Sequence, residues 1–181
     1  MAQSITITGA LGSGKSTVAQ MLSEILGYTY YSTGKAQRHI AEQMGLTTLE
    51  LNLLADEDPS IDEKIDSVFK KMNKDGKSYV VDSRLAWHFM PDSFKVKLVT
   101  DEDTAAFRIM NDKTRTGERH YETEEDAKKE IINRRNSEIA RFLNTYHVDI
   151  ENNDMFDLIV DTTNITPKQV CNTIIDAYHR S

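Results

Sequence analysis

The spacing of hydrophobic residues changes near the first lysine of the chain. Residues 5–8 alternate β-branched and polar side chains and stop at Gly9, which predicts a short buried strand. From Lys15 the hydrophobic positions recur three and four residues apart as far as Leu26, which is the spacing of an amphipathic helix. Gly27 follows where the C-terminal cap of that helix belongs. This pattern predicts a strand, a glycine-containing loop and a helix in succession.

The same alternation of strands and helices continues along the chain. Further strands are predicted at residues 28–31, 79–82, 95–100 and 157–161. Further helices are predicted around residues 40–44, from a capping box at 47–50, over 61–72, after Asp101, from Thr123 to about Tyr146, and from Thr166. Strands that alternate with helices indicate parallel strands joined by crossovers. We therefore expect a three-layer α/β fold, with a central parallel sheet of five strands and helices on both faces.

Length and composition narrow the class of protein. With 181 residues, 39% of them hydrophobic and 28% charged, the chain suits one folded domain and excludes a disordered protein. The single cysteine, Cys171, excludes an intramolecular disulfide framework and leaves no ligand set for a structural zinc site. No hydrophobic run is long enough to span a bilayer, and no apolar signal peptide is recognisable. We expect a cytoplasmic monomer or homodimer with no membrane partner.

The distribution of charge points to a small anionic ligand. The net charge of −7 argues against a nucleic-acid partner. Six of the nine arginines nevertheless lie between residues 108 and 141. Such a concentration of guanidinium groups suits a small and highly charged ligand, although a solvated helix face with mixed charges would also explain it.

Residues 9–16 match the pattern G-x-x-x-x-G-K-[ST] at every fixed position. The glycines let successive backbone N–H groups face one concavity, to which the following helix adds its positive end. Lys15 would reach the β- and γ-phosphates of ATP, and the Ser16 hydroxyl would complete a magnesium shell. Because a strand precedes the motif and an amphipathic helix follows it, we predict an ATP-binding loop. Its residues are Gly9, Ala10, Leu11, Gly12, Ser13, Gly14, Lys15, Ser16 and Thr17.

Asp82 is the second candidate for the magnesium site, because it ends a buried hydrophobic strand. Its carboxylate would reach Mg²⁺ through water or hold Ser16 in place. A plain cap or turn residue is the alternative interpretation. Ser16 and Asp82 are therefore the predicted metal residues.

Two arginines follow strand ends and are candidates for binding a second phosphate. Arg38 comes about one helical turn after Thr33 and Gly34, and Arg84 lies two residues after Asp82. Because the C-terminal ends of parallel strands share one edge of a sheet, both side chains can face a ligand beside the phosphate loop. Two forked guanidinium groups suit a dianionic phosphomonoester. Surface ion pairs are the alternative for each arginine.

These motifs resemble a known family of enzymes. The segment STGKAQR, residues 32–38, resembles the STGDxxR element of adenylate kinases, in which the arginine and the preceding Thr-Gly contact the acceptor monophosphate. More closely, the chain is similar to the short, archaeal-type cytidylate kinases. The similar stretches are ITITGALGSGKSTVAQMLSEILG, LLADEDPSIDEKID, VVDSRLAW and NRRNSEIARFLNTYHVDIENNDMFDLIVDTT. They cover most of the chain, with gaps mainly over 85–95 and 111–127.

The resemblance implies one P-loop kinase domain over residues 1–181 that transfers the ATP γ-phosphate to CMP or a similar pyrimidine nucleoside monophosphate. It implies that Thr33, Gly34, Arg38 and Arg84 bind the acceptor phosphate. The core would comprise 1–35, 76–110 and 142–181, the acceptor-binding subdomain about 36–75, and the lid about 111–141. Ser83 stands where members often have glycine, and Lys15 stands where many have threonine. These two departures leave the base preference open.

An arginine-rich helix supplies the remaining candidates. On a helical wheel of residues 131–146, Arg134, Glu138 and Arg141 flank a hydrophobic arc, and Arg135 falls inside it. An inward charge is costly unless an anion such as a triphosphate pairs with it; snorkelling or a structural carboxylate is the alternative. In the resembled family, lid arginines contact the transferring phosphoryl group. The predicted catalytic residues are Lys15, Arg134, Arg135 and Arg141; Arg115 and Arg119 are assigned to the lid, and Arg108 to the donor nucleotide.

Several alternatives remain open at this point. A kinase of another small metabolite, such as dephospho-coenzyme A or a sugar acid, would share the phosphate loop, as would a regulatory ATPase. Trp87 would stack on a base or pack in the core, with packing favoured. Cys171 is interpreted as a small buried side chain. The five histidines are scattered without the spacing of metal ligands.

Overall fold

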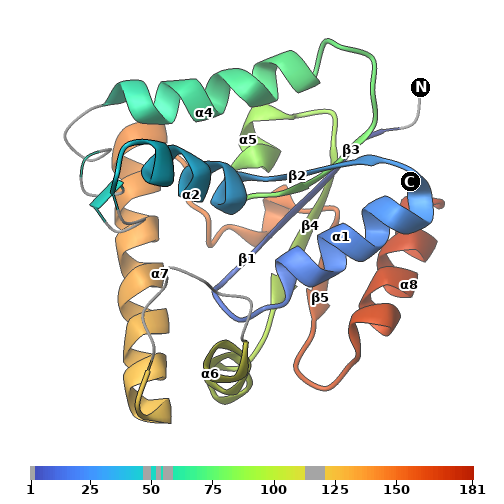
Figure 1. The fold of residues 1–181 in the computed structure, drawn as a ribbon. Helices are drawn as coiled ribbons and strands as arrows, with labels where there is room; N and C mark the ends of the chain where they lie inside the picture. Colours follow the sequence, from blue (N-terminus) through green and yellow to red (C-terminus); the bar gives the residue numbers. More distant parts are fainter. Residues whose placement is uncertain (1–2, 47–49, 52–53, 55–58, 113–120) are drawn as a thin grey trace.

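The computed structural model describes residues 3–46, 50–51, 54, 59–112 and 121–181. A sheet of five parallel strands lies at its centre, in the order β2-β3-β1-β4-β5 (Figure 1). The strands are β1 (Ile5–Gly9), β2 (Thr29–Ser32), β3 (Tyr79–Asp82), β4 (Phe94–Val99) and β5 (Leu158–Asp161). The predicted fold class is therefore confirmed, and each strand lies within one or two residues of its predicted position.

Helices cover both faces of the sheet. They are α1 (Lys15–Leu26), α2 (Thr33–Gln43), α4 (Pro59–Met72), α5 (Ala86–Phe89), α6 (Glu102–Asn111), α7 (Glu124–Tyr146) and α8 (Pro167–Tyr178), with a 3₁₀ turn η1 (Asn153–Met155). Helices α1 and α8 pack on one face, and α4 and α5 pack on the other. Helix α7 packs against α6 and stands at one side of the molecule, away from α8 (Figure 1). The sequence pattern did not predict α5 or η1.

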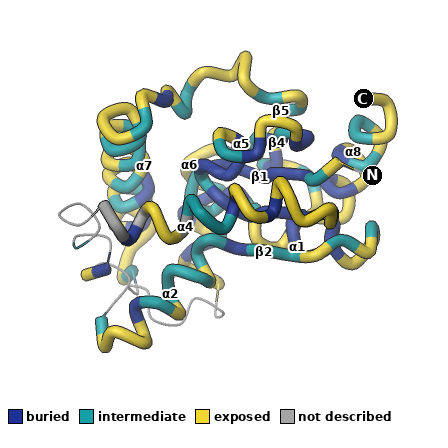
Figure 2. The backbone as a smooth tube through the Cα atoms, turned by 90° about the horizontal axis from the view of Figure 1, so that it is seen from above, coloured by how far each residue is buried: buried dark blue, intermediate teal, exposed yellow. Residues whose placement is uncertain are grey.

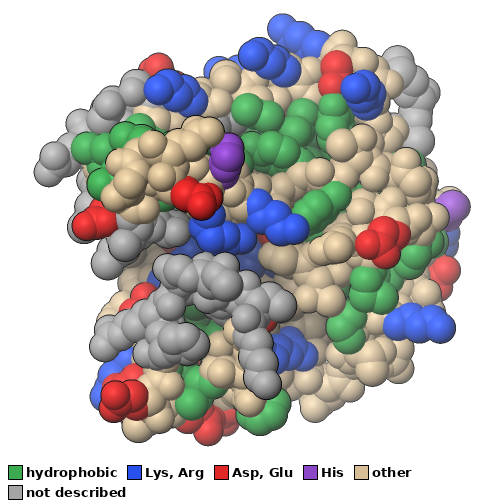
Figure 3. All heavy atoms as spheres, in the orientation of Figure 1, with side chains coloured by type: hydrophobic (Ala, Val, Ile, Leu, Met, Phe, Trp, Pro, Cys, Tyr) green, Lys and Arg blue, Asp and Glu red, His purple; other side chains and the backbone are tan. Residues whose placement is uncertain are grey.

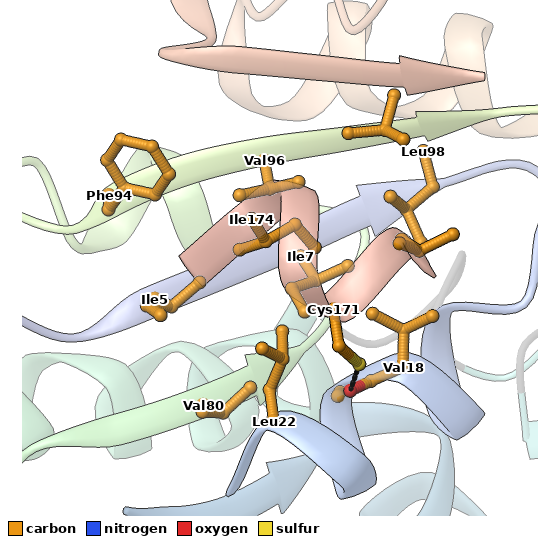
Figure 4. Packing of buried hydrophobic residues seen from close by; sticks show 13 residues of the cluster. Ile5, Ile7, Val18, Leu22, Val80, Phe94, Val96, Leu98, Cys171 and Ile174 are labelled. Carbon is orange, nitrogen blue, oxygen red and sulfur yellow. Dashed lines mark hydrogen bonds between the residues drawn. The ribbon is translucent and has the colours of Figure 1, made fainter. Parts of the chain in front are cut away.

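The main hydrophobic core lies between the sheet and the pair α1 and α8 (Figure 4). Ile5 and Ile7 of β1 are fully buried there, and Cys171 of α8 directs its Sγ toward the carbonyl oxygen of Val18, 3.7 Å away. Burial raises the pKa of the Cys171 thiol. Cys171 is therefore a packed core residue, as the sequence indicated.

The helix ends follow the capping residues that the sequence contains. The Thr123 side chain accepts a hydrogen bond from the backbone N–H of Asp126 at the start of α7, and Thr166 forms a capping box with Gln169 at the start of α8. Gly27 ends α1 in the left-handed conformation. Residues 47–49 of the predicted capping box and the predicted lid residues Arg115 and Arg119 lie outside the described residues. Within the part of the chain that the structure describes, we find no helix of the length and hydropathy needed to cross a membrane.

Candidate active site

The C-terminal ends of β1, β2 and β3 meet at one edge of the sheet and carry the predicted site residues. The strand register pairs Asp82 at the end of β3 with Ile7 of β1 on one side and with Ser32 of β2 on the other. The phosphate loop therefore emerges from β1 beside Asp82, and α2 begins immediately after Ser32. Parallel pairing alone brings these three segments together.

The phosphate loop depends on glycine at two positions. Gly9 has a φ of 150°, and a Cβ atom there would lie 2.3 Å from the carbonyl oxygen of Leu98. Gly12 has a φ of 78°, and its Cβ would lie 2.7 Å from the carbonyl oxygen of Ala105 on α6. The backbone of the loop thus passes too close to β4 and α6 for any side chain. Within the loop, the buried Ser13 hydroxyl donates to the carbonyl oxygen of Ala10 at 2.8 Å.

Lys15 lies at the start of α1, and its Nζ donates to the Ala10 carbonyl oxygen at 2.9 Å. The residue keeps some solvent exposure, but protein atoms surround its ammonium group. Burial and, to a smaller extent, the neighbouring Arg84 guanidinium outweigh the opposite effects of Asp82 and Glu138 and lower the Lys15 pKa to about 7. Negatively charged polyphosphate oxygens beside Lys15 would favour its protonated form and so restore its charge.

Asp82 orders the hydroxyl that the sequence assigned to magnesium. Its side chain is buried, and Oδ2 accepts hydrogen bonds from the Ser16 hydroxyl at 2.5 Å and the Ser32 hydroxyl at 3.3 Å. Asp82 therefore holds Ser16 in place, which is one of the two roles predicted for it. A carboxylate and a hydroxyl are hard oxygen donors, so this pair fits a magnesium shell that phosphate and water would complete. Among the described residues, no group of three or more His, Cys, Asp or Glu side chains has the arrangement of a metal site.

Arg84 reaches the phosphate loop, as predicted, and is ion-paired there. Its Nη1 donates to the carbonyl oxygen of Gly9, and its Nε lies 2.7 Å from Oε2 of Glu138 on α7. The Nε–H is not aligned with that oxygen, so the contact is an ion pair more than a hydrogen bond. The backbone of Arg84 is fixed as well, because its carbonyl oxygen accepts from Trp87 Nε1 at 3.0 Å and from Thr8 at 3.1 Å. Trp87 is a core residue, 3% exposed, and this confirms the packing interpretation.

Glu138 gathers a second arginine beside the first. Its Oε1 lies 3.3 Å from Nε of Arg134, one turn earlier on α7. Burial alone would raise the Glu138 pKa, but Arg84, Arg134 and Lys15 together hold it below its ordinary value. Figure 3 shows Lys and Arg side chains meeting near the centre of this face of the molecule. The sequence placed Glu138 near Arg134 but gave no sign that the carboxylate would also reach Arg84.

Arg108 lies beside the loop, where a donor nucleotide would pass. Its terminal nitrogens donate to the Gly12 carbonyl oxygen at 3.3 Å, and to the hydroxyl and carbonyl oxygens of Thr162 at 3.0 and 2.6 Å. Thr162 in turn donates to the Ser13 carbonyl oxygen at 3.1 Å. Arg108 thus ties the phosphate loop to the segment that follows β5. Its contact with a donor nucleotide stays a prediction.

The predicted inward orientation of Arg135 is wrong. Its side chain is 50% exposed and pairs with Glu151. The helical wheel assumed that one face of α7 packs along its whole length, whereas Ile132 and Leu143 are 39% and 49% exposed. Figure 2 shows exposed stretches between part-buried ones along α7. Arg135 lines a cavity of about 310 Å³ between α7, α6 and the first residues of the phosphate loop. A structural carboxylate, the alternative given by the sequence, explains its charge.

Three residues predicted to bind the acceptor phosphate lie in the first turns of α2. Thr33 Oγ1 is buried and has no hydrogen-bond partner among the described residues. Arg38 is half-buried, and its Nη1 lies 3.6 Å from the position that a Cβ atom of Gly34 would take. The Arg38 guanidinium therefore lies close to Gly34, in the first turns of α2. Arg141 of α7 is half-buried and has an interaction partner, so its assignment to catalysis stays a prediction.

Tyr30 is a neighbour of this site that the motif analysis missed. Its hydroxyl is buried without a hydrogen-bond partner among the described residues, and burial followed by the Asp82 charge raises the Tyr30 pKa. Ser16 and Ser32 lie close to the Tyr30 hydroxyl and act to lower its pKa, although neither has the geometry of a hydrogen bond to it. Alternation along β2 places Tyr30 on the same face as Ser32, and this signal was present in the sequence.

Comparison with known proteins agrees with this geometry. Residues 4–164 match the model of the cytidylate kinase-like family. A cytidylate kinase from Natronomonas pharaonis is 36% identical over 180 residues, which cover 96% of this chain and 90% of that protein. An S-adenosylmethionine-dependent nucleotide dehydratase from Lacinutrix mariniflava is 33% identical over 183 residues; the alignment covers all of this chain but only 37% of the dehydratase.

Solved structures show the same fold at lower identity. Shikimate kinase from Acinetobacter baumannii superposes with a TM-score of 0.64 at 14% identity, covering 99% of this chain and 94% of that one. The likeness establishes the P-loop kinase fold. Together with the kinase relatives and the phosphate loop, it makes the chain an ATP-dependent phosphotransferase. The chain belongs to the cytidylate kinase-like family.

Proposed function

We propose that this protein is a nucleoside monophosphate kinase that transfers the γ-phosphoryl group of ATP to CMP or a similar pyrimidine nucleoside monophosphate. The products would be ADP and the nucleoside diphosphate. One observation carries the proposal: Arg84, Arg134 and Lys15 surround Glu138 directly beside the phosphate loop. A water nucleophile needs no such group of guanidiniums, whereas a second phosphate does.

The donor half of the site consists of the phosphate loop, Lys15, Ser16 and Asp82. The backbone N–H groups of the loop and the N-terminus of α1 would hold the β- and γ-phosphates of ATP. Family members use ATP with a divalent metal ion, and we assign Mg²⁺ to Ser16 and Asp82. The metal would supply charge neutralisation at the β- and γ-phosphate oxygens.

The acceptor half consists of Thr33, Gly34 and Arg38 on α2, with Arg84 opposite. The unpartnered Thr33 hydroxyl supports this assignment, because a buried hydroxyl without a partner costs about 1–3 kcal/mol and a phosphate oxygen would satisfy it. Residues from about 36 to 75 would then form the acceptor-binding subdomain and residues from about 111 to 141 the lid, around the core.

The reaction needs no nucleophilic side chain from the protein. Its chemistry consists of bringing the acceptor phosphate oxygen into line with the γ-phosphorus and neutralising the charge that spreads over the transferred group. Lys15, whose Nζ reaches the Ala10 carbonyl oxygen, would act on the donor side, and Arg84, whose Nη1 reaches the Gly9 carbonyl oxygen, would act between donor and acceptor. The arginines of α7 would complete the neutralisation, and closure over the site would exclude water.

Two alternatives share the phosphate loop. A kinase of dephospho-coenzyme A or of a sugar acid fits the fold, but the Natronomonas pharaonis relative is named a cytidylate kinase, and the dehydratase is named for a nucleotide as well. A regulatory ATPase would hydrolyse ATP without an acceptor. The clustered arginines and the orphaned Thr33 hydroxyl favour the monophosphate kinase over both.

A coupled assay of ADP release against a panel of nucleoside monophosphates, shikimate, gluconate and dephospho-coenzyme A tests the proposal. We expect release to depend on CMP or a related pyrimidine monophosphate. The Arg38→Ala variant should raise the KM for that acceptor at least about tenfold and leave the KM for ATP nearly unchanged. A rate of ADP release that does not change when any nucleoside monophosphate is added would refute the proposal.

A further inference from the structure

Glu138 occupies the centre of the cation cluster, although the phosphate loop and the acceptor residues do not require it. Its side chain is 19% exposed, and its two carboxylate oxygens are divided between two arginines. Oε2 faces Nε of Arg84 at 2.7 Å, and Oε1 faces Nε of Arg134 at 3.3 Å. The second arginine comes from the same helix as Glu138, and the first comes from the segment after β3. Glu138 therefore joins α7 to the core at the phosphate loop.

Electrostatics explains why an anion is needed at this point. Arg84, Arg134 and Lys15 all act on the Glu138 carboxylate, so three positive charges converge there. Without a counter-ion, like charges at such separations repel one another, and partial burial reduces the screening by water. A carboxylate among them permits the guanidiniums to remain close together before any phosphate arrives.

The orientation of the Arg84 guanidinium also matters. Arg84 turns its Nε toward Glu138, and its Nη1 reaches the carbonyl oxygen of Gly9 at the start of the phosphate loop. The forked end of the guanidinium, which binds phosphate oxygens best, therefore faces the loop. A guanidinium without the Glu138 contact would lose this orientation more readily, because the arginine side chain is long and has many rotamers.

We propose that Glu138 is the positioning residue of the arginine cluster: in the substrate-free protein its carboxylate holds Arg84 and Arg134 beside the phosphate loop, with the forked end of Arg84 directed toward the site of phosphoryl transfer. This inference rests on the proposed function only for its kinetic consequence. The ordering of the two arginines is a property of the protein without ligands. Glu138 acts through the arginines and needs no contact with the substrate to do so.

The variant Glu138→Gln keeps the shape of the side chain and removes its charge. We expect the KM for the nucleoside monophosphate to rise about tenfold or more, as for loss of a charged contact, while the KM for ATP changes less than about twofold. Glu138→Asp keeps the charge on a shorter stem and should recover part of the loss. The matched control is Glu125→Gln on the same helix, because among the described residues Glu125 pairs with Lys129 alone, at 3.9 Å on the exposed surface. That control should behave as wild type.

A second readout does not depend on activity. In ligand-free wild type, the ¹⁵Nε–¹Hε signals of Arg84 and Arg134 should be resolved, and that of Arg134 should exchange slowly with water because its Nε donates to Glu138. Both signals should be displaced or lost in Glu138→Gln and shifted in Glu138→Asp. Unchanged arginine signals in a folded Glu138 variant would overturn the inference, as would an unchanged acceptor KM.

If wild type releases ADP with no monophosphate, the proposed function fails, and the arginine signals alone decide the role of Glu138. If Glu138→Gln does not fold, the shifts in Glu138→Asp decide it.

Discussion

The phosphate loop and helix α7 bring cations to the same site, but different forces hold them. The loop is fixed by its backbone: Gly9 and Gly12 run against β4 and α6, and the Ala10 carbonyl oxygen accepts bonds from Ser13 and Lys15. Helix α7 reaches the loop through side chains, chiefly the Glu138 ion pairs. Backbone geometry makes the phosphate loop rigid, whereas ion pairs can exchange partners. We therefore expect the phosphate loop to be preformed and the ion pairs of Arg84 and Arg134 to rearrange when phosphate binds.

The largest expected effect comes from the rigid region. Replacing Lys15 by Met should lower kcat on the order of 10³-fold or more, because the charge beside the transferred phosphoryl group disappears. The variant should melt no lower than wild type, because burial already disfavours the charged lysine, whose pKa is lowered to about 7. Steady-state kinetics and thermal melts measure both quantities. A loss of activity below about tenfold would show that the loop does not carry the donor chemistry.

The glycines of the loop give the next effect. Gly12→Ala should destabilise the protein by about 2–4 kcal/mol, because its Cβ would collide with the Ala105 backbone at a φ of 78°. The control is Gly27→Ala, which has a φ of 68° but open space around its Cβ, so that only about 1 kcal/mol of backbone strain applies. Denaturant unfolding measures both. Equal losses in the two variants would mean that close approach to α6 is unimportant.

The ion-paired region should lose stability at acid pH, where the Glu138 carboxylate becomes protonated. Because the Glu138 pKa in the folded protein lies below its ordinary value of 4.5, its ionised form stabilises the fold. That contribution is fully present above about pH 4.5 and is lost as pH falls through the folded-state pKa. The melting temperature of wild type should therefore exceed that of Glu138→Gln at pH 7, and the gap should narrow below pH 4.5. A gap that stays constant to pH 3 would contradict the ionised state of Glu138.

The smallest expected effect concerns the far end of α7. The Tyr146 hydroxyl donates to Asp66 of α4 at 3.0 Å and so ties the arginine helix to the acceptor side. Tyr146→Phe should cost about 1–2 kcal/mol in the free energy of unfolding, as for one hydrogen bond to a charged group. Chemical denaturation measures it. A neutral result would indicate that the packing of Phe89 against the Tyr146 ring, 5.5 Å between centroids, holds α7 without the hydroxyl.

The sequence predicted the parts of this molecule that local chemistry controls. The phosphate loop, the caps at Thr123 and Thr166, and the strand ends at Ser32 and Asp82 all follow from short motifs and from the geometry of parallel strands. Tyr30 could have been found from the same geometry, because it shares a face of β2 with Ser32.

The parts that sequence analysis missed depend on which surface an element meets in three dimensions. Arg135 was placed inward because six hydrophobic residues share its side of α7, yet α7 packs only along parts of that side, and Arg135 pairs with Glu151 at the surface. The double pairing of Glu138 requires Arg84, which is 54 residues earlier (138 − 84). Neither contact has a local signature.

The most direct test of the whole account is a ³¹P NMR spectrum of the purified protein with MgATP and CMP. Phosphoryl transfer would produce the paired resonances of ADP and CDP as those of ATP and CMP decline, with almost no inorganic phosphate. A spectrum in which only ADP and inorganic phosphate accumulate, or in which CMP and every related monophosphate remain intact, would show that the guanidiniums at this loop do not hold a nucleotide acceptor.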